Sequence, residues 1–271
     1  MPELPEVETI KRELAPLVTG QRIKSVEFLW TKTLLSPSIA EFDSRVKGRR
    51  ITGVGRRGKY LIIRLDGGDS ILVHLRMTGS FLVGRGKELP DSHTRVVIHL
   101  GGGLNMFFID PRKFGKFQLV EDTSNEILEK LGPEPLSAAF TSAALAAQLS
   151  GRKIPIKAVL VDQEVVAGIG NMYADEALYQ ARIHPLRTAD SLSGDEIRRL
   201  HRAIRHVLKE AIENKGASIA NYFRPGGEHG TAHKEFKVAH RRGQGCPVCG
   251  EPIERIVVRQ RGTYFCPSCQ T

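Results

Sequence analysis

The feature that most constrains the fold is a set of four cysteines confined to the end of the chain. They form two Cys-x-x-Cys pairs, Cys246/Cys249 and Cys266/Cys269, and the 271-residue sequence contains no other cysteine. The 16 residues between the pairs give the spacing typical of a four-thiolate zinc site. Two disulfides are the alternative, but nothing indicates secretion, and a reducing cytosol keeps thiols free. We therefore expect one structural Zn²⁺, since four thiolates leave no open position for catalysis.

The segment between the cysteine pairs is expected to form a β-hairpin. Ile256–Val258 and Thr263–Phe265 are β-prone runs, and the stretch Arg259–Gly262 between them suits a turn. Arg261 would then lie in the turn of a zinc-bound hairpin.

The chain carries an excess of positive charge. Lys and Arg total 40 against 30 Asp and Glu, which gives a formal net charge of +10. Such a protein favours anionic partners, of which nucleic acid is the commonest. A membrane surface is the alternative, but no apolar run approaches the ~20 residues needed to cross a bilayer, and no signal peptide precedes the first expected helix. A soluble cytoplasmic protein is predicted.

Hydrophobic periodicity divides the chain into a β-rich part and a helical part. Apolar residues at helical spacing predict a helix over 5–18, and Gly20 follows as a stop. From about 22 to 122, short β-prone runs alternate with Gly or Asp, which predicts a sandwich or barrel-like domain. The clearest of these runs are Tyr60–Ile63, Ile71–Val73, Val96–Ile98 and Met106–Ile109.

The second half is expected to be helical. A polar stretch around 121–136 is interpreted as a linker, and a capping box at Ser193 and Glu196 opens a periodic segment that runs to Ala211. Residues 215–245 lack periodicity and contain six glycines, which is typical of a functional or disordered loop.

The first residues combine an unusual amine with nearby carboxylates. If Met1 is removed, Pro2 presents a secondary amine, and a terminal α-amino group has a reference pKa of roughly 8, below that of Lys. Such an amine can attack an electrophilic carbon and give an imine. Glu3 and Glu6, one turn apart if a helix begins here, supply carboxylates for proton transfer. The alternative is an ordinary helix start, which Pro5 and the acidic residues also suit.

The run Met-Pro-Glu-Leu-Pro-Glu-Val-Glu-Thr over residues 1–9 resembles the N-terminal signature of the formamidopyrimidine-DNA glycosylase family, bacterial enzymes that excise oxidised purines from DNA. Matching motifs follow in order near residues 59, 77, 112, 171 and 261 and at the cysteines, so the resemblance covers the whole chain. It implies an α+β fold, with an N-terminal β-sandwich domain preceded by a helix and a C-terminal helical domain that carries a helix–two-turn–helix element and a zinc hairpin. The expected boundaries are a catalytic domain over 1–122, a linker over 123–136, a helical domain over 137–222, a lesion-recognition loop over 223–245 and a zinc finger over 246–271.

The resemblance also implies the catalytic residues. Pro2 would attack the sugar carbon of the damaged nucleotide, and Glu3 would donate a proton, with Glu6 as a supporting carboxylate. Lys59 would assist β-elimination. Arg261 would bind the phosphates of the lesion and take part in δ-elimination, and an arginine also suits bidentate phosphate contact. As bare residues, Lys59 and Arg261 are equally compatible with solvated surface cations.

A second group of residues matches family positions that hold DNA. Gly168 and Gly170 precede Asn171, so a phosphate could approach backbone N–H groups at a helix start, with Asn171 as an added donor. The alternative is a tight turn between two helices. The other matched DNA contacts are His93, Arg152 and Lys157.

A glycosylase must flip its target nucleotide out of the duplex and fill the space. The resemblance assigns this role to Met77, Arg112 and Phe114. Met and Phe can wedge between bases, and Arg can hydrogen-bond the orphaned partner base. The alternative is that Met77 and Phe114 are ordinary core residues near loop ends.

One region departs from the family pattern. Val238-Ala239-His240-Arg241 replaces an aromatic-Gly-Arg run, Gly245 stands where Pro is usual, and Thr231–Lys234 lacks a frequent Phe-Gln pair. The loop that cups the flipped base lies nearby. Its glycines and few apolar residues predict that about 217–238 is mobile until a damaged base is bound.

The sequence therefore predicts a monomeric, bifunctional DNA glycosylase and abasic-site lyase for oxidised purines such as 8-oxoguanine and formamidopyrimidines, ending in β,δ-elimination. Its partner would be double-stranded DNA in the bacterial nucleoid, and no redox or nucleotide cofactor is needed. An endonuclease VIII-type enzyme for oxidised pyrimidines is one alternative, but its usual start resembles Pro-Glu-Gly-Pro-Glu, whereas this chain has Leu4. A non-catalytic zinc-finger DNA-binding protein is the other, and Pro2, Glu3 and Lys59 count against it.

Overall fold

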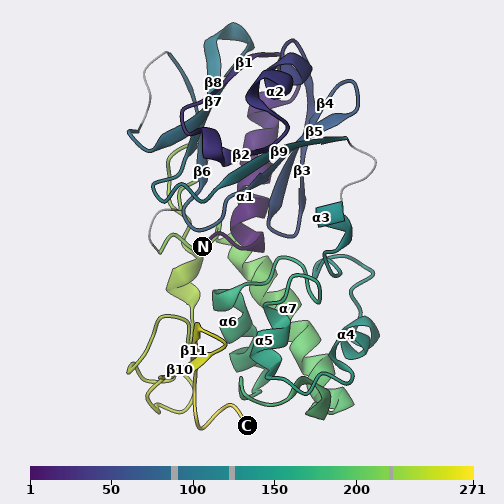
Figure 1. Cartoon of the computed structure of the whole chain (residues 1–271). Helices are drawn as coiled ribbons and strands as arrows, with labels where there is room; N and C mark the ends of the chain where they lie inside the picture. The colour runs from purple at the N-terminus through teal and green to yellow at the C-terminus, as the bar shows by residue number, and fades with distance from the viewer. Residues whose placement is uncertain (87–90, 122–125, 220–221) are drawn as a thin grey trace. The chain divides into compact units, whose positions relative to one another are not determined.

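A computed structural model describes residues 1–86, 91–121, 126–219 and 222–271 (Figure 1). The chain forms two compact units. The first comprises Met1–Glu129 together with Asn214–Thr231, and the second comprises Lys130–Glu213 together with Ala232–Thr271.

The first unit is built on two sheets. The four-stranded sheet has the order β1 (Ile23–Phe28), β7 (Thr94–Leu100), β8 (Leu104–Ile109) and β6 (Ser80–Arg85). The five-stranded sheet has the order β2 (Leu34–Ser36), β9 (Lys116–Glu121), β5 (Asp69–His74), β4 (Tyr60–Leu65) and β3 (Ile51–Arg57). The strand pairs are antiparallel except for β2 with β9. Shorter elements are η1 (Thr31–Thr33), η2 (Gly101–Gly103) and α3 (Glu126–Glu129).

Both sheets share one hydrophobic core with the helices α1 (Leu4–Val18) and α2 (Ile39–Val46). Figure 1 shows α1 between the two sheets. Val7, Ile10, Leu14 and Val18 on α1 are fully buried. Each such side chain stabilises the fold by roughly 1.5–3 kcal/mol. The helical spacing seen in the sequence is therefore the spacing of the buried face, and the predicted β-sandwich is confirmed.

The second unit is mainly helical. Its elements are α4 (Ser142–Leu149), α5 (Ile156–Leu160), α6 (Asn171–Ala181), η3 (Ala189–Ser191), α7 (Gly194–Glu213), η4 (Ala232–Glu235), β10 (Glu254–Val258) and β11 (Arg261–Phe265). Helix α7 packs on α6 and α4. The predicted capping box starts α7, since Ser193 N donates to Glu196 Oε2 at 2.8 Å and Glu196 N donates to Ser193 Oγ at 3.3 Å.

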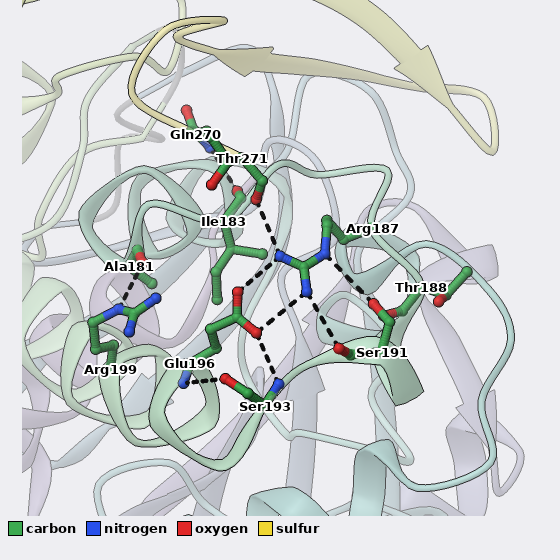
Figure 2. Close-up of polar contacts among 10 residues, drawn as sticks. All are labelled: Ala181, Ile183, Arg187, Thr188, Ser191, Ser193, Glu196, Arg199, Gln270 and Thr271. Atoms are coloured by element: carbon green, nitrogen blue, oxygen red, sulfur yellow. Dashed lines mark hydrogen bonds and ion pairs between the residues drawn. The ribbon is translucent and has the colours of Figure 1, made fainter.

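Arg187 joins the start of α7 to the end of the chain, as Figure 2 shows. Its Nη1 and Nη2 donate to the two carboxylate oxygens of Glu196 at 2.8 and 3.2 Å, and Nη1 also donates to the carbonyl of Thr271 at 3.3 Å. Gln270 adds a second link, because its Nε2 donates to the carbonyl of Ile183 at 2.9 Å. These contacts attach the residues after the last cysteine pair to the helices of the second unit.

The two compact units differ from the expected domain boundaries at the proposed linker. Within that stretch, residues 122–125 lie outside the described residues, and 126–129 form α3. Residues 132–135 pack onto the second unit, because Gly132 N donates to Gln163 O at 2.9 Å and Pro133 O accepts from Ala167 N at 3.1 Å. These backbone contacts attach residues 132–135 to the second unit, so this part of the stretch is not a free linker.

The second difference concerns Asn214–Thr231, which we call the return segment because it rejoins the first unit. Tyr222 in this segment belongs to the sandwich core, and Arg224 Nε donates to both carboxylate oxygens of Glu13 at 2.9 and 3.0 Å. Val83 N donates to Pro225 O at 3.2 Å. The described part of the predicted loop over 217–238 therefore has packing partners that its composition did not indicate, while residues 220 and 221 lie outside the described residues.

The helices within the described ranges include none that is long and apolar enough to cross a membrane.

Candidate functional site

The predicted nucleophile lies at the buried start of α1. Pro2 and Glu3 are buried, while Met1 before them is 41% exposed. The nitrogen of Pro2 is in a peptide bond as long as Met1 is present, so amine chemistry requires removal of Met1. The extended conformation of Glu3 at the N-cap places Pro2 just outside the first turn of the helix.

The carboxylate of Glu6 holds the start of α1 through hydrogen bonds. Its Oε2 accepts from Glu3 N at 2.7 Å, and its Oε1 accepts from Ala217 N in the return segment at 2.8 Å. Gly216 is required beside it, because a Cβ there would lie 2.9 Å from Glu6 Oε1. Glu6 therefore positions Glu3, and its use as a supporting carboxylate in proton transfer stays a prediction.

Lys59 is buried in a two-residue turn between β3 and β4. Gly58 supplies the positive φ of 55° that this turn needs. The neighbouring His74 was not singled out from the sequence. Burial lowers the pKa of His74 to about 3, with Arg76 and Lys59 adding positive charge nearby, so its imidazole is neutral beside Lys59. Its Nδ1 accepts from Arg76 N at 3.0 Å, which supports the positive φ of Arg76.

Two loops of the first unit present the three residues assigned to filling the duplex. We call residues 110–115 the wedge loop. Its base is the carboxylate of Asp110, which is bonded to the hydroxyl of Thr78 and accepts from Gly115 N at 2.7 Å. The same hydroxyl accepts from Arg112 N at 3.3 Å, so the wedge loop and the loop carrying Met77 are fixed together.

The side chains at these loop tips are exposed. Met77 is 40% and Phe114 is 47% exposed, so neither is the ordinary core residue that the sequence left open. The guanidinium of Arg112 lies 4.9 Å from the centroid of the Phe114 ring. Large exposed apolar side chains on a rigid loop fit a wedge between bases. A hollow of about 400 Å³ beside them is lined by Met1, Arg76, Met77, Lys113, Phe114 and Lys116.

His93 stands on the surface near the base of the wedge loop. Its Nδ1 pairs with Asp91 Oδ1 at 2.7 Å, and its carbonyl accepts from Asp110 N at 3.0 Å. Its imidazole is exposed enough to reach a ligand, and its DNA contact stays a prediction.

Asn171 is the first residue of α6, as the glycines before it indicated. The turn before the helix is held by Gln163, whose Oε1 accepts from Gly168 N at 3.0 Å and whose Nε2 donates to the carbonyls of Val161 and Ile169 at 2.9 and 2.8 Å. The N–H of Gly168 is therefore already used within the protein. Asn171 Nδ2 donates to Gly262 O at 2.7 Å, which ties the helix start to β11.

Lys157 does not lie on the surface. It is 1% exposed, and its ammonium bonds the carboxylate of Asp175, also 1% exposed, and the carbonyl of Asn171. Burial raises the pKa of Asp175 to about 7, and Lys157 opposes that shift. The expected contact between Lys157 and the DNA backbone needs an exposed ammonium, so in this conformation Lys157 supports Asn171 from within.

Arg152 and Arg261 have the exposure that phosphate contact requires. Arg152 is half-buried and donates through Nε to Gln148 O at 2.8 Å. Arg261 is exposed and is the first residue of β11, directly after the turn rather than within it. The turn itself is Arg259-Gln260, both with positive φ. A hollow of about 380 Å³ lies between this turn and α5, with Gln163, Arg259 and Arg261 among its lining residues.

The four cysteines come together as the sequence predicted. All four thiols are free, and their Sγ atoms lie within 4.8 Å of one another. Zn–S bonds of ~2.3 Å arranged tetrahedrally need sulfurs ~3.8 Å apart, and the Cys246–Cys269 pair is at 3.9 Å and the Cys249–Cys266 pair at 3.5 Å. The residues fit one structural Zn²⁺, which would hold the two ends of the hairpin together.

The segment that departs from the family pattern is held by a buried carboxylate. Glu176 on α6 accepts from the backbone N–H groups of Lys237, Val238 and Ala239 at 2.8–3.1 Å. Since these bonds use only backbone groups, the side chains of Val238 and Ala239 can differ while the path of the chain is kept.

Comparison with known proteins gives a consistent result along the chain. Residues 1–117 match the formamidopyrimidine-DNA glycosylase N-terminal domain, 131–222 match the formamidopyrimidine-DNA glycosylase H2TH domain, and 243–271 match the zinc finger found in FPG and IleRS. The formamidopyrimidine-DNA glycosylase of Chloroflexus aurantiacus is 48% identical over 271 residues, which cover 100% of this chain and 98% of that protein. That of Roseiflexus sp. is 47% identical, with 100% of both chains covered.

Solved structures agree with the sequence comparison. The crystal structure of the MutM (FPG) protein from Thermus thermophilus superposes with a TM-score of 0.90 at 44% identity, covering 99% of this chain and 98% of that chain. A Lactococcus lactis FPG mutant in complex with Fapy-dG-containing DNA superposes with a TM-score of 0.93 at 34% identity, with both chains fully covered.

A β-sandwich unit, an H2TH unit and a four-cysteine zinc finger define a class of DNA glycosylases that act in base excision repair. Within that class, the chain belongs to the formamidopyrimidine-DNA glycosylase family. It is accordingly a DNA-binding enzyme, as the sequence predicted, rather than a non-catalytic zinc-finger protein.

Proposed function

We propose that this enzyme excises oxidised purines with Pro2 as its nucleophile. The observation that carries the proposal lies within the first unit. Pro2 and Glu3 are buried together at the start of α1, and Met1 directly before them lines the same hollow as Met77 and Phe114. A nucleotide displaced by those two side chains would enter a space that borders the N-terminus.

The proposed reaction begins when removal of Met1 frees the Pro2 amine. The amine attacks C1′ of the damaged nucleotide, the bond from C1′ to the base breaks, and the base leaves with the bonding electrons and takes up a proton. Glu3 gives a proton to the sugar ring oxygen, so the ring opens to a Schiff base. Lys59 then assists β-elimination, and Arg261 binds the phosphate and takes part in δ-elimination. Hydrolysis of the Schiff base returns the free amine.

The experiment that tests this proposal is borohydride trapping on a duplex that contains 8-oxoguanine opposite cytosine. Reduction should join the protein to the DNA, and peptide mapping should place the adduct on residue 2. Pro2→Gly should trap weakly while keeping its affinity for undamaged DNA. An adduct on Lys59 would overturn the mechanism.

We further propose that the enzyme works as a cytoplasmic monomer on double-stranded DNA. The net charge of +10 supports an electrostatic contribution to DNA binding. Analytical ultracentrifugation of free protein and of its complex with a single-lesion duplex tests the stoichiometry, and a 2:1 complex would contradict it.

Oxidised pyrimidines are a second candidate class of substrate. One Lactococcus lactis FPG structure similar to this chain, at 34% identity and a TM-score of 0.92, is a complex with DNA containing an oxidised pyrimidine. Single-turnover excision of an oxidised pyrimidine and of 8-oxoguanine by the same preparation decides the preference, and faster excision of the pyrimidine would favour the endonuclease VIII-like alternative.

A further inference from the structure

The single tryptophan of the chain has a position that the proposed reaction does not explain. Trp30 lies in the first unit between β1 and η1, and its side chain is half-buried. The ammonium of Lys113 is 4.3 Å from the centroid of its ring, and that of Lys32 is 5.8 Å away. A cation within about 6 Å of a tryptophan face is attracted by the negative charge of the ring face.

Lys113 stands between the two wedge-loop residues assigned to the DNA duplex, Arg112 and Phe114. Its φ is 62°, in the left-handed region that a lysine adopts only where its surroundings hold it. The backbone is held by Lys113 N, which donates to Asp110 O at 3.2 Å. The side chain is held over Trp30.

Two further links join the Trp30 segment to the wedge loop. Trp30 N donates to Arg95 O at 3.2 Å, and Arg95 Nε in turn donates to the carbonyl of Asp110 at 2.9 Å. Just beyond the other end of the loop, Lys116 Nζ donates to Lys32 O at 2.7 Å. The segment therefore holds the wedge loop near both ends and at its middle residue.

We propose that Trp30 is a positioning residue that fixes the wedge loop through Lys113 and thereby sets how sharply the enzyme distinguishes the base opposite the lesion. The inference rests on the proposed role of Arg112 and Phe114. If the Lys113 side chain leaves the ring, its left-handed backbone loses a support, and the peptide planes on either side turn with it. Arg112 and Phe114 are attached to those planes, so the reach of both side chains changes.

The test is a ratio of excision rates, so that a general loss of activity cancels. The single-turnover rate constant for excision is measured for 8-oxoguanine opposite each of the four bases, for the wild type and for Trp30→Leu, Trp30→Phe and Lys113→Met. Loss of one exposed cation–π contact corresponds to a change of about two- to five-fold, so Trp30→Leu should lower the discrimination ratio by that factor. Trp30→Phe should retain most of the discrimination, because a phenyl ring still attracts the ammonium. Leu29→Ala, an exposed neighbour, is the matched control.

A double-mutant cycle separates this role from a separate contact of Lys113 with DNA. If Lys113 acts through the ring, Trp30→Leu combined with Lys113→Met should lose no more discrimination than either single variant. Additive losses would overturn the inference. So would an unchanged ratio for Trp30→Leu when Arg112→Ala does lower it. If Arg112→Ala has no effect on the ratio, the proposed function of the wedge loop fails instead, so the two failures are distinguishable.

Fluorescence supplies a readout that does not depend on activity. Because Trp30 is the only tryptophan, its emission reports on the ring over which Lys113 lies. Lys113→Met should change the emission of free protein, and lesion duplex should change the wild-type emission more than it changes that of Lys113→Met. Identical responses of the two proteins would contradict the contact even if Trp30→Leu proves too unstable to assay.

Discussion

The wedge loop of the first unit and α5 of the second unit each carry a cation that the sequence predicts to contact DNA, but they hold it in opposite ways. Arg112 is on the surface beside an exposed Phe114, and the polar groups that fix it lie beneath, in Asp110 and Thr78. Lys157 is buried instead. Its ammonium pairs with Asp175 and donates to the carbonyl of Asn171 beneath the protein surface. Of two cations predicted to contact DNA, one is therefore exposed on a loop and the other is buried as an internal support.

The difference has an energetic consequence. An exposed cation costs little to remove, because water solvates what is left behind. A buried cation leaves an uncompensated carboxylate in a low dielectric when it is removed, which costs several kcal/mol. Substitution of Arg112 should therefore change DNA recognition at constant stability, and substitution of Lys157 should change stability first.

The largest effect is expected where the second unit depends on metal. Cys249→Ser should lose zinc and DNA binding together, since the hairpin that carries Arg261 folds around the site. Elemental analysis of wild-type protein should give one zinc per chain. Full activity of metal-free wild type would contradict the structural role, and Ser268→Ala, an exposed residue between Cys266 and Cys269, is a matched control.

The next largest effect is expected at the buried pair Lys157–Asp175, which is the most direct test of the comparison. Lys157→Met should lower the free energy of unfolding by about 3–5 kcal/mol, because Asp175 is left without its cation. Chemical denaturation measures the loss, with the exposed Lys153→Met as control. If Lys157→Met instead keeps its stability and only reduces the salt dependence of DNA binding, the lysine contacts phosphate directly and the comparison fails.

Arg112→Ala tests the exposed side of the comparison. It should reduce discrimination among the four bases opposite the lesion by about 1–3 kcal/mol, the range for one base-specific contact, with the unfolding midpoint unchanged. Arg85→Ala, an exposed arginine of the same unit, provides the control. Equal losses opposite all four bases would indicate a surface role without base contact.

The smallest effect on stability is expected for the ion pair between Arg187 and Glu196. Its exposure lies between that of the buried Lys157–Asp175 pair and that of Arg112. The Arg187 guanidinium lowers the pKa of Glu196 to about 2, from a usual value near 4.5. A lowered carboxyl pKa stabilises the fold above pH 4.5, and the contribution disappears as the pH falls through 2. Because the Glu196 side chain is 17% exposed, Glu196→Gln should cost only about 1–2 kcal/mol at pH 7.

Denaturation of wild type and Glu196→Gln across pH 2 to 7 should show this difference shrinking below pH 4.5. Glu213→Gln, exposed on the same helix, should show none. A difference that stays constant with pH would mean that the carboxylate charge is not the source of the stability.

Most of the fold followed from local patterns in the sequence. The predicted runs Tyr60–Ile63, Ile71–Val73, Val96–Ile98 and Met106–Ile109 lie within β4, β5, β7 and β8, because each is a short apolar run, rich in β-branched or aromatic residues, that its sheet buries almost completely. The cysteine spacing likewise predicted the hairpin. The return segment could not be predicted, since its packing depends on Tyr222 and Arg224 meeting residues far away in the sequence.

The sequence predicted which residues belong to the candidate site better than it predicted their burial and contacts. Exposure of Met77 and Phe114 agrees with a wedge role, but an apolar residue in a loop carries no local sign of whether it is buried. His74 and Trp30 were missed for a related reason, because an aromatic ring in or beside a strand is usually core. The burial of Lys157 depends on Asp175, 18 residues later, and no periodicity links the two.

The return segment also has a consequence for how the protein is made. The start of α1 depends on Glu6, and Glu6 accepts a bond from Ala217, so the first unit is incomplete until more than two hundred residues have left the ribosome. By then Lys130–Glu213 of the second unit has already emerged. The first unit therefore closes only after Asn214–Thr231 has emerged, and a fragment ending at residue 129 would lack both the Tyr222 that fills its core and the partner that orients its N-terminus. Synthesis thus places most of the second unit between the two parts of the first, and the second unit is itself completed only by Ala232–Thr271.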